Sequence, residues 1–170
     1  MDYKDVTTIE EFNQAKAEFL AKHPELKLPK PIECLNLIMR KEFALEILNG
    51  TKTVEFRDLS EHYINRLIDK DTNNWMADHL DDDNAVNLIS DVRPVKRIHF
   101  HNYNNSWTLD VEVVNNDYCA VIDKDVKYLQ QAFNCHELDE LLNEYNQAEE
   151  EDRPIYFYFA LGKVIDSKGL

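Results

Sequence analysis

The sequence predicts an α+β domain built on a small sheet or barrel. Residues 95–113 and 155–164 carry side chains in the period-two pattern that is typical of β-strands. Residues 8–22 and 137–146 instead repeat apolar residues at helical spacing. About five strands and several helices, without an internal repeat or a low-complexity segment, indicate one domain of mixed architecture.

The first predicted helix, over residues 8–22, starts with Thr8-Ile9-Glu10-Glu11, which has the form of a capping box. Three prolines within residues 24–31 prevent this helix from continuing. We therefore interpret residues 1–31 as an N-terminal helix with a proline-rich strap, and residues 32–170 as the main domain.

The main domain is predicted to begin with a buried strand over residues 34–39 and a short amphipathic helix over residues 41–49. Gly50 can adopt the left-handed conformation that commonly ends a helix, so we expect it to cap this one. A strand over residues 52–57 follows. Residues 58–94 then form a helix-prone insert, because their apolar residues recur at helical spacing.

After the insert the period of two returns. Residues 95–103 and 107–113 flank a turn rich in asparagine at residues 102–106, and this pattern predicts a β-hairpin. A helix is expected around residues 137–146, and the last strand over residues 155–164.

Composition narrows the classes of function. The chain of 170 residues has a formal net charge of −14, which is unfavourable for a broad nucleic-acid-binding face but allows a small basic pocket. No apolar run reaches the roughly 18 residues of a membrane span, so we expect a cytoplasmic protein that makes no membrane contact. Three widely spaced cysteines without a CxxC pair indicate reduced thiols, and no cofactor is predicted.

The segment from Gly50 to Arg57 (GTKTVEFR) has the most informative pattern. In a strand, Val54 and Phe56 point to one face, while Thr53, Glu55 and Arg57 point to the other. Such a polar face with opposite charges side by side is solvated, structural or part of a site. Lys52 stands at the entry of the same strand.

The order of elements around this segment, with its G-x-K-x-x-E-x-R pattern, resembles the ASCH (activating-signal-cointegrator homology) domain over roughly residues 34–165. The resemblance implies a PUA-like fold: a small mixed or antiparallel β-barrel with flanking helices, here with an N-terminal helical extension. It also implies that RNA or a modified nucleoside binds in a local cleft lined by Lys52, Glu55 and Arg57.

Some bacterial ASCH proteins are enzymes, and this gives a second hypothesis. One branch hydrolyses the acyl amide of N4-acetylcytidine, and another is described as a ribonuclease. The catalytic lysine of the amidohydrolase branch matches Lys52. That branch has a threonine three residues later, where this chain has Glu55. The insert at residues 58–94 is a second departure from the family pattern.

The chemistry of these side chains is consistent with either hypothesis. Lys52 is a candidate base or nucleophile, and Glu55 a candidate general acid or base; these two are the predicted catalytic residues. Arg57 is a candidate anion-binding residue, and the Thr53 hydroxyl a candidate hydrogen-bond partner. Alternatively, Glu55 and Arg57 form a structural ion pair that closes the barrel end, and the protein is a non-catalytic interaction domain.

Three aromatic residues are candidates for stacking on a base: Tyr103 and Trp107 beside the hairpin turn, and Tyr158 in the last strand. The alternative for each is ordinary packing in the sheet. His99 and His101 share one strand face, but no third ligand has suitable spacing, so no metal site is predicted.

Overall fold

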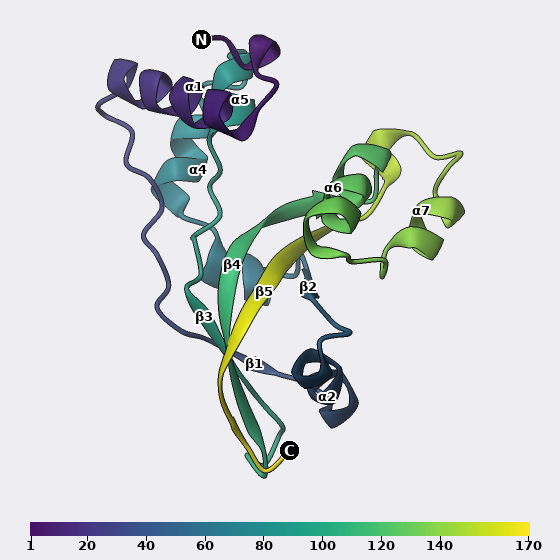
Figure 1. The fold of residues 1–170 in the computed structure, drawn as a ribbon. Helices are drawn as coiled ribbons and strands as arrows, with labels where there is room; N and C mark the ends of the chain where they lie inside the picture. The colour runs from purple at the N-terminus through teal and green to yellow at the C-terminus, as the bar shows by residue number, and fades with distance from the viewer. The chain divides into compact units, whose positions relative to one another are not determined.

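The computed structural model describes residues 1–170 and contains two compact units (Figure 1). The first unit comprises Met1–Lys30 and Asn65–Arg93, and the second comprises Pro31–Ile64 and Pro94–Leu170. The first division falls between Lys30 and Pro31. Most of the helix-prone insert, residues 65–93, belongs to the same unit as the N-terminal segment. No helix is long and apolar enough to cross a membrane.

The first unit is helical. Thr8 accepts a hydrogen bond from the Glu11 backbone amide and so caps α1 (Ile9–Lys22), as the capping box predicts. The helical character predicted for the insert is confirmed by α4 (Lys70–Ala77) and α5 (Asp83–Leu88), while α3 (Glu61–Leu67) carries the chain between the units. The core of the first unit consists of Ala15, Phe19, Leu26, Ala85, Leu88 and Ile89.

The second unit is a five-stranded mixed sheet that curls into a half-barrel. The strands are β1 (Leu35–Ile38), β2 (Val54–Asp58), β3 (Arg97–His101), β4 (Thr108–Ala120) and β5 (Ile155–Lys168). They lie in the order β1-β3-β4-β5-β2, in which only β1 and β3 run parallel. The predicted hairpin is confirmed as β3 and β4. The predicted α+β class with a barrel-like sheet is also confirmed.

Two strands run further than the sequence pattern predicts. β4 continues through Asn115, Asn116 and Asp117. These three residues are polar, so this part of the strand lacks the alternation of apolar and polar residues that identifies a strand in a sequence. These residues pair with β5, and register shifts between Asp110 and Asn115 mark irregularities that bend the pair (Figure 1). The long β4–β5 ribbon forms the centre of the sheet, with β3 on one side and β2 on the other.

Three helices complete the second unit: α2 (Lys41–Asn49), α6 (Asp123–Phe133) and α7 (Asp139–Glu144). Gly50 ends α2 with φ +84°, which confirms the predicted left-handed cap. α6 was not predicted, although Val126, Leu129 and Phe133 recur at helical spacing and pack in the core. A core cluster joins α6 and the segment after it to the sheet; it contains Val54, Cys119, Val126, Leu129, Cys135, Leu138, Tyr158 and Ala160.

Cys119 gives this core a testable dependence on pH. Burial raises the pKa of its thiol from 9.0 to about 12, with the charge of Asp125 as a smaller cause. The folded state therefore keeps the proton that the unfolded chain releases. The contribution of this thiol to stability is complete below pH 9 and is lost as pH rises toward 12.

We expect the free energy of unfolding of the Cys119→Ala variant to fall less steeply between pH 9 and pH 12 than that of the wild type. Urea unfolding at a series of pH values measures both slopes. Lysine and tyrosine titration is common to the two proteins, so it cancels in the comparison. Equal slopes would contradict the prediction.

Candidate functional site

The turn after α2 positions Lys52 at the entry of β2. The backbone amides of Thr51 and Lys52 both donate to the Glu46 carbonyl, at 3.0 and 3.1 Å. The Lys52 side chain is only 6% exposed. Its Nζ lies 2.8 Å from Glu137 Oε1 and 3.6 Å from Glu55 Oε1, so the ammonium sits between two carboxylates.

Glu55 and Arg57 form the ion pair that their spacing allows. Arg57 Nη2 lies 3.1 Å from Glu55 Oε2, and it also donates to the Ile38 carbonyl at 2.9 Å. Arg57 Nη1 donates to the Tyr63 hydroxyl at 2.8 Å. Burial by itself would lower the pKa of Arg57, but the charge of Glu55 and the contact with Tyr63 outweigh it and raise the pKa above its ordinary value.

Glu137, Lys52, Glu55 and Arg57 therefore make a row of alternating charges, which we call the charge network. Lys52 is 8% and Glu55 7% exposed, and each has a partner of opposite charge on two sides. Such complete pairing is what a buried charge requires. The network joins β2 to the end of β1 through the Ile38 carbonyl. This geometry matches the structural alternative for Glu55 and Arg57.

Glu137 is the member of the network that sequence patterns missed. It lies in the segment between α6 and α7, and its second carboxylate oxygen accepts from the Cys135 thiol at 3.9 Å. A buried lysine demands a carboxylate partner, but the acidic residues between 137 and 152 offered many equivalent candidates. Only the fold brings this one to Lys52.

Two predicted ligand-binding residues have partners inside the protein. The Thr53 hydroxyl donates to the Phe133 carbonyl at 2.6 Å, which anchors the end of α6. The Tyr158 ring belongs to the core and is 5% exposed, and its hydroxyl accepts from Asn115 Nδ2 at 2.9 Å. Burial raises the pKa of that hydroxyl. Because its side chain is buried in this core, Tyr158 packs in the sheet rather than stacking on a base.

His99 and His101 do share a strand face, as their spacing predicts, and their rings stack at 5.7 Å. His99 Nδ1 lies 2.9 Å from Asp110 Oδ1, and His101 Nδ1 lies 2.8 Å from the Asn102 carbonyl. Each ring therefore has one nitrogen occupied by a neighbour on the sheet or at its end.

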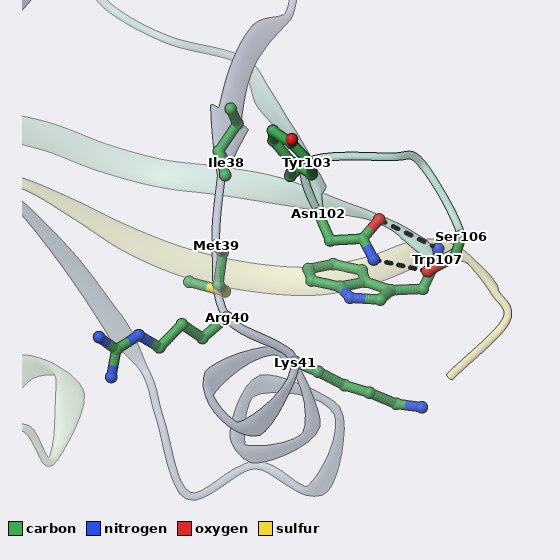
Figure 2. A pocket seen from close by; sticks show the side chains of 8 residues that line it. All are labelled: Ile38, Met39, Arg40, Lys41, Asn102, Tyr103, Ser106 and Trp107. Atoms are coloured by element: carbon green, nitrogen blue, oxygen red, sulfur yellow. Dashed lines mark hydrogen bonds between the residues drawn. The ribbon is translucent and has the colours of Figure 1, made fainter.

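A pocket of about 520 Å³ opens where the end of β1 and the start of α2 face the turn between β3 and β4 (Figure 2). Two of the predicted aromatic residues meet here. Tyr103 is 90% exposed at the rim, whereas Trp107 is 3% exposed and forms the floor. The remaining lining residues are apolar, cationic or neutral polar side chains: Ile38, Met39, Arg40, Lys41, Asn102 and Ser106.

The charge network supports one wall of this pocket. Arg57 Nη2 donates a hydrogen bond to the Ile38 carbonyl, and the Met39 amide donates to the His101 carbonyl at 3.0 Å. Both contacts fix the short segment that leads from β1 into α2. Lys52 and Glu55 are not lining residues of the pocket, and their catalytic roles stay predictions.

No family model matches the chain, and no curated protein or solved structure resembles it.

Proposed function

We propose that the second unit recognises an unpaired RNA nucleotide, or a modified nucleoside, in the pocket between β1, α2 and the β3–β4 turn. The observation that carries this proposal is that an exposed aromatic ring, Tyr103, lines the same pocket as two cationic side chains, Arg40 and Lys41, on a chain with a net charge of −14. Proteins hold unpaired bases by stacking them on aromatic rings and hold the attached phosphates with cations.

The proposal includes membership of the ASCH group with a PUA-like fold. Its support is the curled half-barrel and the place of Gly50, Lys52, Glu55 and Arg57 at the junction of α2 and β2. It departs from the expectation of a cleft lined by all three charges, because the pocket lies beside the charge network rather than within it. In this view the network is the scaffold of the ligand site.

Electrostatics limit the size of the contact with RNA. The acidic surface repels phosphates outside the pocket, so only one or two phosphates of a strand contact cationic groups. We therefore expect a short single-stranded RNA to bind with a logarithmic salt slope of about −1 for affinity, since each neutralised phosphate contributes roughly −0.7.

Titration of fluorescently labelled single-stranded RNA at salt concentrations from about 50 to 200 mM measures this slope. A double-stranded RNA of the same sequence is the control, and its paired bases should prevent binding in the pocket. A steep slope, or equal affinity for the two RNAs, would contradict recognition of a single unpaired nucleotide.

A further inference from the structure

The floor of the pocket holds a hydrogen-bond donor without a partner. Trp107 is only 3% exposed, and its backbone amide donates to Asn102 Oδ1 at 3.4 Å. Its indole N–H makes no hydrogen bond within the protein. Figure 2 shows the nitrogen on the edge of the indole that faces the start of α2. No buried side-chain nitrogen or oxygen of the protein lacks a hydrogen-bond partner, so the unpaired indole N–H is open to the pocket, where it can donate to an acceptor of a ligand.

The start of α2 offers further donors to the same space. Arg40, the N-cap residue, makes no capping hydrogen bond with its side chain. The amides of Phe43 and Ala44 bond to the Arg40 carbonyl, whereas the amides of Lys41 and Glu42 precede the first intrahelical bonds. A nine-residue helix with free first-turn amides attracts an anion, because its dipole is positive at this end.

The side chains at the rim have the matching charge. Arg40 is 81% exposed on its side chain, lies 3.6 Å from Glu42, which is itself 63% exposed, and extends away from the indole in Figure 2. Lys41 is exposed, makes no ion pair, and extends past the indole in Figure 2. Backbone amides, an indole N–H and the Lys41 ammonium together suit the several oxygens of a phosphate better than the two of a carboxylate.

From these groups we infer that the pocket contains a phosphate subsite, formed by the first turn of α2, Lys41 and the Trp107 indole N–H. This inference rests on the proposed function, and it names the ligand more closely: a nucleotide whose phosphate lies at α2 while its base stacks on Tyr103. A nucleoside without phosphate is then a weaker ligand than its monophosphate.

The indole resonances in a ¹H–¹⁵N NMR spectrum report on this subsite directly. The chain has two tryptophans, and Trp75 in the first unit already donates to Glu25 at 3.3 Å, so its signal is an internal control. Inorganic phosphate, the common ribonucleosides with N4-acetylcytidine, and the corresponding 5′-monophosphates are titrated separately. Acetate at equal ionic strength controls for charge screening.

We expect phosphate and the monophosphates, but not acetate, to shift the Trp107 indole proton as its hydrogen bond forms. Lys41→Gln should weaken binding of the best monophosphate by about fivefold, as expected for one cation at a helix start. Lys127→Gln, an exposed lysine on α6, should leave it unchanged.

The outcomes separate this inference from the proposed function. Equal binding of nucleosides and monophosphates, with an unmoved Trp107 signal, would overturn the phosphate subsite and leave nucleoside recognition standing. A Trp107 shift with inorganic phosphate, but no tighter binding of any nucleotide or RNA, would overturn nucleotide recognition and leave an anion site. A Lys41→Gln variant that binds the monophosphate like wild type would count against the role of Lys41 and the subsite as drawn.

Discussion

Replacing Glu55 with glutamine is expected to lower the free energy of unfolding by about 3 kcal/mol, because it removes the carboxylate that compensates the Arg57 guanidinium and one of the two that compensate Lys52. Glu55 lies between Lys52 and Arg57, at 3.6 and 3.1 Å, and is 7% exposed. The neutral amide would leave Lys52 with Glu137 as its one carboxylate partner and Arg57 with none, and the two cations would face each other across the amide.

Urea unfolding followed by circular dichroism gives the stability of each variant. Glu46→Gln is the matched control: this exposed residue of α2 has no ion pair in the structure, so the change should be within about 0.5 kcal/mol of wild type. Lys52→Met combined with Glu55→Gln should cost less than the sum of the single changes, because the two residues share a contact. A Glu55→Gln variant as stable as wild type would show that the network is not buried and paired in solution.

Replacing Tyr103 with alanine is expected to weaken binding of single-stranded RNA by about tenfold or more, since base stacking on an aromatic ring contributes roughly 1–3 kcal/mol. The ring is 90% exposed, so its loss should leave the free energy of unfolding unchanged. This combination of a large binding effect and no stability effect is what distinguishes a ligand-facing residue from a packing residue.

Tyr128→Ala is the matched control for this experiment, because Tyr128 is an exposed tyrosine of α6 at 44% exposure and is not a lining residue of the pocket. It should bind RNA as wild type does. Tyr103→Phe keeps the ring and should retain most of the affinity. Unchanged RNA binding by Tyr103→Ala, or an equal loss in Tyr128→Ala, would remove base stacking in this pocket from consideration.

Local chemistry explains which parts of the fold were predictable from the sequence. The cap at Gly50 and the strand that follows depend on residues close together in the chain, and both predictions are confirmed. The pairing of Glu55 with Arg57 also follows from spacing on one strand face. Glu137 could not be identified in this way, because its contact with Lys52 depends on how the segment after α6 packs on the sheet.

Burial was harder to predict than strand position. Tyr158 alternates with Phe157 and Phe159 as expected, but alternation assigns side chains to faces without saying which faces are covered. Both faces of β5 are covered here, since residues 157–160 are all buried. The pocket was equally hidden, because Arg40 and Trp107 lie far apart in the sequence and meet only through the parallel pairing of β1 with β3.

The strand order has a consequence for how this protein folds as it is synthesised. β2 pairs only with β5, and Val54 of the one faces Ala160 of the other, so β2 finds its partner after most of the chain has left the ribosome. Until then Lys52 and Glu55 lie on an unpaired strand in water. Fragments that end before residue 155 should therefore keep β2 and its charges accessible to proteases and chaperones, and closure of the half-barrel becomes a late, slow step.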